Sequence, residues 1–536
     1  MSKSLGPKLL FLFPLLLSCG SQQSVPEASL PEVNNIAQTI SEARKLGPSE
    51  RQSKAFTLYK DLIRGAYFKP MGTPGFLEGI AKTRYVSVEK EFSLSHAVAM
   101  TKPIKRQDYL GAIDPSVKTR ESLLSYLNQK GYEAKAELNL GLILDPNPTF
   151  DIFAAQWDNN NGMAFYRTAN RGLFRFGPDG EAIPDLAESV SRGEDKLTYT
   201  IKIGDHYWKD SAGADLRKIV AADFEDTYKT FWPKYEAVFY DTHVKSFKAI
   251  NEKTIEVVAE FEDSLFLKEF DNIFNYPSPK DYMESLPEYG STPESTVFSG
   301  DYAISYDGIK TIDMTASKEG IMPKITFTIG SAGTLSDFET GKTDYIWGSF
   351  QEEEAIPATR SLTHCLFFDW RKIDPEHRKG LLNPYFRYAL LSLFPRDRIN
   401  AYFGYADNRL KPTWLPSNHR PGPAPEPEDL QSDETIPYAI ACFKKAQEQL
   451  GSEFFSSPIS IVVKTLGKGG FDAELKRRAQ EIFGNYISMS VFHPTSDFVA
   501  STSAGLIRIG YFDRSRIDLL ESLSHYERQG FGLYQV

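Results

Sequence analysis

The sequence predicts an α/β protein in which a mainly helical N-terminal segment precedes mixed domains. Segments with strand features alternate with segments with helix features from residue 136 onward, which is typical of α/β domains. Residues 36–135 instead show mainly helical periodicity. The chain has 536 residues, of which 41% are hydrophobic, and this is enough for two or three domains with substantial cores.

The N-terminus has the features of an export signal. Lys3 and Lys8 precede the apolar run 9–17, which is too short to cross a bilayer, since a spanning helix needs about 20 residues. The tetrapeptide LLSC that ends at Cys19 resembles the bacterial lipobox, in which the cysteine carries a lipid. We therefore expect residues 1–19 to be a lipoprotein signal peptide with Cys19 as the lipidation site. The alternative is an ordinary cleaved signal.

A polar stretch with two prolines, residues 20–35, follows and is expected to be a tether. No later stretch of the sequence approaches membrane-spanning length. The expected location is therefore the cell envelope, on the periplasmic side or at the outer membrane, with the N-terminal lipid as the membrane anchor.

Expected helices and strands follow from the spacing of apolar residues. Between 36 and 135, helices are expected at IAQTISEARKL, AFTLYKDLIRGAY and TRESLLSYLNQKGY. Beyond 135, strands are expected at ELNLGLIL, DKLTYTIKIG, TIEVVAEF, KITFTIG and CLFFDW. Helices are expected at AADFEDTYKTFW, FRYALLSLF, YAIACFKKAQEQL and DAELKRRAQEIF, and a proline-rich surface loop at 418–430.

Charge and cysteine content exclude several classes of partner. The chain has 61 Lys and Arg against 71 Asp and Glu, a formal net charge of −10, and no basic run, so we expect no nucleic-acid partner. The eight histidines are scattered and no close set of four ligands is present, so we expect no metal site and no cofactor. Cys365 and Cys442 either pair in an oxidising compartment or are two buried thiols.

An ordered series of short motifs runs through the chain. In sequence order they are LDP (144–146), RGLFRFGPDGEAIPDLAESV (171–190), DKLTYTIKI (195–203), Trp208, IVAADFEDTYKTFW (219–232), FSGDYAI (298–304), FETGKTDYIW (338–347) and FRYALLSLFPRDRI (386–399). The series resembles the extracellular solute-binding proteins of ABC importers, specifically the large peptide, opine and nickel class. Each motif is weak by itself, but their shared order is specific.

The segment 173–190 illustrates the resemblance. Pro178, Asp179 and Gly180 are turn residues, so a hairpin is expected there. PDLAES (184–189) is the part that distinguishes the family from a generic hairpin. These residues are expected to build the first lobe and to make no ligand contact.

The resemblance implies a two-lobed fold that closes on a solute. Lobe I would comprise residues 136–310 and 506–536, and lobe II residues 311–505, with 36–135 as an added extension. An oligopeptide or similar small solute would lie between the lobes, its backbone pairing with extended segments of the protein, and would pass to ABC permease subunits. We expect the protein to be a monomer.

Candidate ligand contacts come from the same resemblance. In the family a Gly-Trp strand is followed by an aspartate that holds the ligand's amine. Here LIRIGYFDR supplies Gly510, with Tyr511 in place of the tryptophan and Asp513 one residue earlier than the usual acid. This offset reverses the direction of a side chain in a strand, so Asp513 could instead be a solvated acid. Asp226 occupies the helix position at which the family often has an aromatic residue.

Two features depart from the family and keep a second function open. The printed chain ends at Val536, soon after this strand, so lobe I is expected to lack part of its usual sheet, and the segment before 136 is an addition. The alternative function is therefore a surface lipoprotein that uses the same fold as a sensor, an adhesin or an assembly partner.

Catalysis is not expected. The sequence has neither a GxSxG nor an HExxH motif. TLGKGGF (465–471) lacks the spacing of a phosphate-binding loop, and a turn before the next helix explains its glycines. The acidic run Glu352–Glu354 is interpreted as a solvated charged surface.

Overall fold

The computed structural model describes most of the chain. The described residues are 30, 35–72, 80–87, 93–114, 116–142, 148–154, 160–176, 182–231, 243–271, 275–330, 333–348, 356–357, 363–368, 375–395, 435–464, 471–492, 507–512, 519–521 and 523. The expected signal peptide, Cys19, nearly all of the tether, the LDP motif, the turn at 178–180, Asp513 and the loop at 418–430 lie outside this part. No helix among the described residues is long and apolar enough to cross a membrane.

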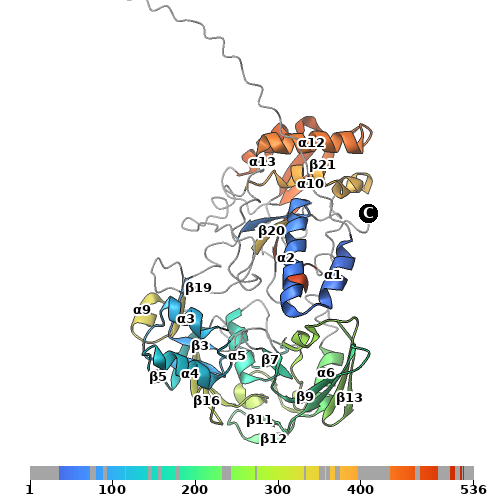
Figure 1. Ribbon diagram of the computed structural model, residues 1–536. Coiled ribbons are helices and arrows are strands. Elements are labelled where there is room, and N and C mark those ends of the chain that lie inside the picture. Colours follow the sequence, from blue (N-terminus) through green and yellow to red (C-terminus); the bar gives the residue numbers. More distant parts are fainter. Residues whose placement is uncertain are drawn as a thin grey trace, which may run out of the picture.

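The described chain forms two bodies, which Figure 1 shows one above the other. We call the described residues between 80 and 357 the first body, and the described residues between 36 and 72 and between 363 and 523 the second body. Each has its own hydrophobic core. The chain passes from the second body to the first between β1 (Phe68–Gly72) and β2 (Ile80–Thr83), and returns between β19 (Ile356–Pro357) and β20 (Thr363–Phe368).

Two four-stranded sheets form the frame of the first body. The first has the order β13-β14-β10-β9, with β9 Ala187–Arg192, β10 Thr198–Ile203, β13 Val244–Asn251 and β14 Thr254–Ala259. The second has the order β15-β16-β17-β6, with β6 Glu137–Leu142, β15 Tyr302–Tyr306, β16 Thr311–Ala316 and β17 Lys324–Ile329. Strand β10 alternates buried Tyr199, Ile201 and Ile203 with more exposed residues, so one face of its sheet is packed against the core.

Helices and small sheets complete the first body. The helical elements are α3 Arg106–Ala112, α4 Arg120–Gln129, α5 Asn160–Ala169, α6 Ala221–Thr230, η1 Phe266–Asp271, α8 Lys280–Ser285, η3 Pro293–Ser295 and α9 Leu335–Glu339. The smaller sheets combine β3 Tyr85–Ser87, β4 Ala97–Met100 and β5 Ala134–Lys135; β7 Phe174–Phe176 and β8 Ala182–Pro184; β11 Tyr207–Lys209 and β12 Asp215–Lys218; and β18 Tyr345–Gly348, β2 and β19.

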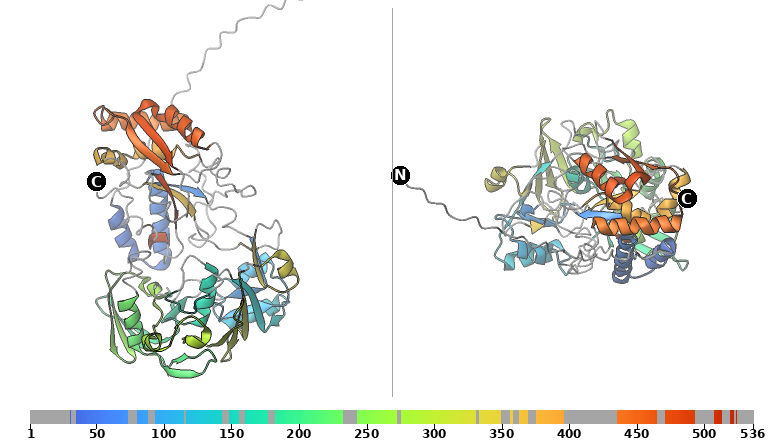
Figure 2. Two further views of the ribbon diagram at one scale, coloured as in Figure 1. Left: turned by 180° about the vertical axis from the view of Figure 1, so that it is seen from behind. Right: turned by 90° about the horizontal axis from the view of Figure 1, so that it is seen from above.

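A five-stranded sheet forms the frame of the second body. Its order is β1-β20-β23-β21-β22, with β21 Ile459–Lys464, β22 Ile487–Phe492 and β23 Ile507–Phe512. The helical elements of this body are α1 Ile36–Arg44, α2 Pro48–Arg64, η5 Pro375–Leu382, α10 Pro384–Leu391, α12 Ile436–Leu450, α13 Phe471–Phe483 and η7 Gly484–Tyr486. Figures 1 and 2 show α1 and α2 extending from this body toward the first.

Local sequence signals explain where the clearest helices begin and what they bury. Thr435 caps α12 by accepting a hydrogen bond from the Tyr438 backbone N–H, and Gly451 follows the helix with a φ of 81°. The buried face of α12 carries Ala439, Cys442 and Ala446, a helical spacing that packs into the core of the second body. Thr119 of α4 and Asn383 of α10 cap their helices in the same way, by accepting from the backbone N–H groups of Ser122 and Phe386.

The boundaries of the two bodies differ from those expected for the two lobes. The boundary at 310/311 falls between the paired strands β15 and β16 and divides a hairpin. The segment 506–536, expected in lobe I, contributes β23 to the sheet of the second body through its pairing with β20 and β21. Strand pairing over such sequence separations is set by tertiary packing, so it leaves little trace in the local sequence.

The segment 36–135 is not a separate extension. Its helices were expected, but it also contains the strands β1 to β5, which the sequence did not reveal. Strand β1 pairs with β20 in the second body, whereas β2 pairs with β18 in the first. Strands of two to five residues are too short for a clear alternating pattern, and Pro70 and Gly72 weaken the strand signal of β1 further.

Candidate functional site

The expected ligand residues are distributed over both bodies. Gly510 and Tyr511 lie on β23, opposite Cys365 and His364 of β20. Tyr511 pairs with His364, the second residue of β20. It therefore lies near the end of the strands at which the chain enters this sheet from the first body. Asp226 is half-buried on α6 in the first body, and no hydrogen bond or ion pair joins it to β23 among the described residues. The structure does not bring these three residues together as one site.

The family-like motifs form the internal framework of the first body. Arg171 donates hydrogen bonds to Asp185 Oδ1 from Nε at 2.9 Å and from Nη2 at 2.5 Å, and to Asp301 Oδ2 from Nη1 at 3.2 Å. The motifs RGLF, PDLAES and FSGDYAI therefore meet at one guanidinium group. Burial acts to raise the pKa of Asp301, but the charges of Arg171 and Lys318 outweigh it and hold this pKa below its usual range.

A second network joins Trp208 to helix α6. The indole Nε1 of Trp208 donates to Asp223 Oδ2 at 3.0 Å, and Arg217 donates to both oxygens of the same carboxylate at 2.9 Å. Asp223 also accepts a hydrogen bond from the Val220 backbone N–H at 3.0 Å, at the start of α6. A buried carboxylate with this many donors is fully satisfied, so Trp208 and Asp223 fix β11, β12 and α6 in place.

The motif FSGDYAI contains a glycine that no other residue can replace without strain. A Cβ added to Gly300 would overlap the carbonyl group of Ala169, with the carbonyl carbon at 2.8 Å. We expect Gly300→Ala to lower the free energy of unfolding by about 1–3 kcal/mol, because rigid backbone must move. Urea denaturation measures this, and Gly47→Ala, where a Cβ meets nothing within 4 Å, is the control with a change of about 0.5 kcal/mol. Equal costs for both variants would contradict the packing at Gly300.

A polar cavity of about 220 Å³ lies beside the Arg171 network. Its lining includes the basic residues Arg167, Arg171, Arg175 and Lys318 and the acidic residues Asp185 and Asp301. Asp301 also forms an ion pair with Lys318 at 2.5 Å. All of its lining residues belong to the first body, so this cavity does not lie between the two bodies.

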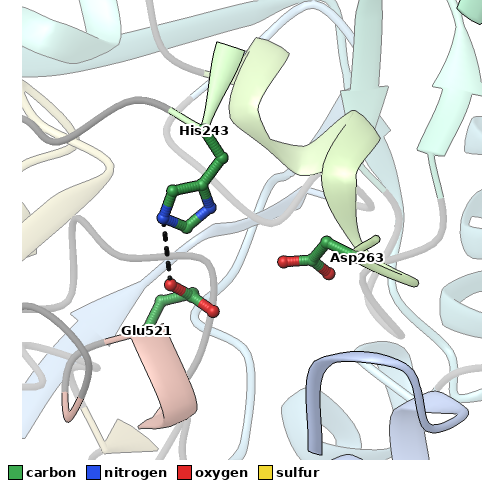
Figure 3. A group of neighbouring side chains, drawn as sticks. All are labelled: His243, Asp263 and Glu521. Atoms are coloured by element: carbon green, nitrogen blue, oxygen red, sulfur yellow. Dashed lines mark ion pairs between the residues drawn. The ribbon is translucent and has the colours of Figure 1, made fainter. Parts of the chain in front are cut away.

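A buried cluster of six charged or titratable side chains joins the two bodies. We call it the interbody cluster: Arg44, Arg51 and Glu521 from the second body, and His243, Asp263 and Glu269 from the first. Figure 3 shows His243 and Glu521 pointing toward each other, with Asp263 facing the same space. This cluster could not be predicted from the sequence, because its six members lie in six separate elements and loops with no common motif.

Ion pairs connect the carboxylates of the interbody cluster, although Oδ2 of Asp263 has no hydrogen-bond partner among the described residues. Arg44 donates to both oxygens of Glu521 at 2.8 Å. Arg51 lies 2.5 Å from Asp263 Oδ1 and 3.1 Å from Glu521 Oε1. His243 lies 3.1 Å from Glu269 through Nδ1 and 3.3 Å from Glu521 through Nε2.

Three members of the interbody cluster lie close enough together to share a metal ion. One nitrogen of His243 and one oxygen each of Asp263 and Glu521 lie within 4.8 Å of one another, which is close enough for a shared ion. Both carboxylates, however, already contact Arg44 or Arg51, so a divalent cation would lie against two guanidinium groups. The donor set fits a balanced ion-pair cluster and does not fit a metal.

Comparisons with known proteins give distant structural matches. Neither a protein-family model nor a curated protein sequence matches the chain. The solved structure of Listeria monocytogenes OppA bound to peptide is 15% identical, covers 75% of this chain and 89% of its own, and has a TM-score of 0.47. The Escherichia coli murein tripeptide binding protein MppA is 15% identical, with 71% and 80% covered and a TM-score of 0.46.

A third match is MoaA from A. tumefaciens R10 in complex with mannopinic acid. It is 17% identical, with 70% of this chain and 78% of that chain covered and a TM-score of 0.41. The two-body architecture described above stands on the strand pairing and the separate cores of this chain.

Proposed function

We propose that this protein is the substrate-binding lipoprotein of an ABC importer. It captures an oligopeptide or a similar small solute between its two bodies and delivers the solute to a membrane permease. In this proposal Cys19 carries the lipid anchor, the protein works as a monomer at the cell envelope, and it catalyses no reaction.

The observation that carries the proposal is the pair of chain passages between two separately packed bodies. The passages β1 to β2 and β19 to β20 leave each body with its own core, so the two can change their relative orientation without either core unfolding. A solute that contacts both bodies would favour the closed arrangement, because only that arrangement offers all of its contacts. The order of the sequence motifs supports the same function.

Native mass spectrometry of the protein, purified from its own host without its lipid, tests this function. We expect bound peptides or similar solutes to appear as added mass and to be released on denaturation. A folded protein that carries no solute, and that binds none from a peptide pool, would overturn the proposal.

The expected ligand residues give a more local prediction. Tyr511→Ala and Asp513→Asn should each weaken peptide binding about tenfold, equivalent to about 1.4 kcal/mol, because each removes a side-chain group that we expect to contact the solute. Isothermal titration calorimetry with a co-purified peptide measures the effect. Glu481→Gln, an exposed change on α13 in the same body, is the control and should leave affinity unchanged. Unaltered affinity in both test variants would place the solute elsewhere.

The interbody cluster favours the second candidate function, a surface lipoprotein that acts as a sensor, adhesin or assembly partner. Its ion pairs between Arg51 and Asp263 and between His243 and Glu521 connect the bodies through buried groups. If these contacts hold the bodies in one arrangement, the protein would bind a macromolecular partner and no solute. The mass-spectrometric experiment separates the two functions, since only the first predicts a released small molecule.

A further inference from the structure

The interbody cluster contains two ion pairs that are almost fully buried and link the two bodies. The side chains of Arg51 and Asp263 are both 0% exposed, and those of His243 and Glu521 are 3% exposed. A backbone hydrogen bond from Ser264 N–H to the Arg44 carbonyl crosses the same boundary. Water is therefore excluded from this contact, and each ion pair acts at a lower effective dielectric than a surface pair would.

The charge balance of the cluster depends on one proton. Arg44, Arg51 and protonated His243 carry three positive charges, which match the three negative charges of the carboxylates Asp263, Glu269 and Glu521. When His243 loses its proton, the six groups together carry a net negative charge in a largely buried site, which is unfavourable.

The charged groups around His243 come from several elements and act on its pKa in different directions. Glu269 of η1 and Glu521 of the second body favour the proton, Arg44 of α1 opposes it, and Arg51 and Asp263 pair beside it. The ring of Phe261 lies 4.5 Å from the imidazole ring, between centroids, and adds no charge.

These contacts fix the direction of the pKa shifts. Burial acts to lower the pKa of His243, but Glu269 and Glu521 outweigh it, and the pKa lies above the ordinary value of 6.5. Burial acts to raise the pKa of Glu521, but Arg44, His243 and Arg51 lower it to about 2. Because the pKa of His243 is raised on folding, its protonation stabilises the fold fully at pH values below its pKa in the unfolded chain. This contribution is lost as the pH rises through its pKa in the folded protein. For Glu521 the contribution is present above 4.5 and is lost as the pH falls through about 2.

We propose that the interbody cluster is a proton-dependent clasp between the two bodies. While His243 holds its proton, the clasp keeps Glu521, α1 and α2 on the first body. Loss of the proton loosens the contact, and the bodies gain freedom to change their relative orientation. The clasp works whether or not a solute is bound, so it does not rest on the proposed function.

A pH series of small-angle scattering on the full chain tests the clasp, with the pair-distance distribution as the readout. We expect the wild-type distribution to broaden as the pH rises through the titration of His243, which NMR of labelled histidine follows independently. In Glu269→Gln the pH midpoint of this broadening should be lower than in wild type, because the variant lacks a carboxylate that stabilises the protonated imidazole of His243. In His243→Gln the transition should disappear.

His206 provides a matched control for His243. His206→Gln removes a half-buried histidine of the first body that contacts Arg171 and does not bridge the bodies, so the transition should persist. A wild-type distribution that stays constant while NMR shows His243 losing its proton would overturn the proposal. A midpoint that is the same in Glu269→Gln and wild type would do so too, even if His243→Gln failed to fold.

Discussion

Replacing Glu521 by alanine should lower the free energy of unfolding by about 3–5 kcal/mol, the cost of removing one partner from a buried ion-pair network. The substitution leaves Arg44 and Arg51 without the carboxylate that both contact, at 2.8 Å and 3.1 Å. The buried charge, rather than the lost contact alone, accounts for most of this cost. Urea denaturation at neutral pH, followed by circular dichroism, measures the change.

An exposed glutamate provides the comparison. Glu481 pairs with Arg477 four residues away on the surface of α13, and Glu481→Ala should cost at most about 0.5 kcal/mol. If Glu521→Ala cost no more than this surface variant, the burial and pairing of Glu521 described above would be wrong.

Replacing Trp208 by alanine should lower the free energy of unfolding of the first body by about 3–5 kcal/mol, because a large, fully buried side chain is removed. Trp208 is 1% exposed in a core that includes Ile201, Phe224 and Val257. Its indole also donates the hydrogen bond that holds Asp223 at the start of α6.

A conservative substitution separates packing from hydrogen bonding at this position. Trp208→Phe keeps most of the apolar volume and removes the Nε1 donor, while Asp223 retains Arg217 and the Val220 N–H. We expect it to cost about 1 kcal/mol through the hydrogen bond, plus a smaller packing loss. The same denaturation experiment applies, and a cost for Trp208→Phe equal to that for Trp208→Ala would contradict the packing role.

The sequence predicted those parts of the fold that depend on local chemistry. Helix α4 begins where the sequence places TRES, and Thr119 and Ser122 form a reciprocal cap there. The strands β6, β10, β14, β17 and β20 coincide with the alternating or apolar runs from which they were expected. Strands β7 and β8, which flank the expected turn at 178–180, pair antiparallel, while the turn itself lies outside the described residues.

The division of the chain into bodies could not be obtained in this way. Whether β23 joins a sheet of the first or of the second body depends on which strand is free to pair with it. That strand is β20, which begins at residue 363, far from β23 in the sequence. The interbody cluster was hidden for the same reason, since Arg51 and Glu521 are 470 positions apart in sequence. A charged residue that is buried on folding has no distinguishing mark in the sequence itself.

The candidate ligand residues stay predictions. The resemblance led to Gly510 and Tyr511, which lie on a strand of the second body near the passage from the first. It also directed attention to Arg171, Asp185 and Trp208 as framework residues of the first body, and their contacts explain why the motifs need these residue types. Asp513 lies outside the described residues and stays a prediction.

The most direct test of the two-body account is a measurement of interbody distance with and without solute. Dyes attached at Leu216 on β12 and at Lys444 on α12, both exposed, report the separation of the first and second bodies by single-molecule energy transfer. We predict that a peptide which binds the protein shortens this distance and narrows its distribution. A peptide that binds with full occupancy and leaves the distance and its spread unchanged would contradict the account.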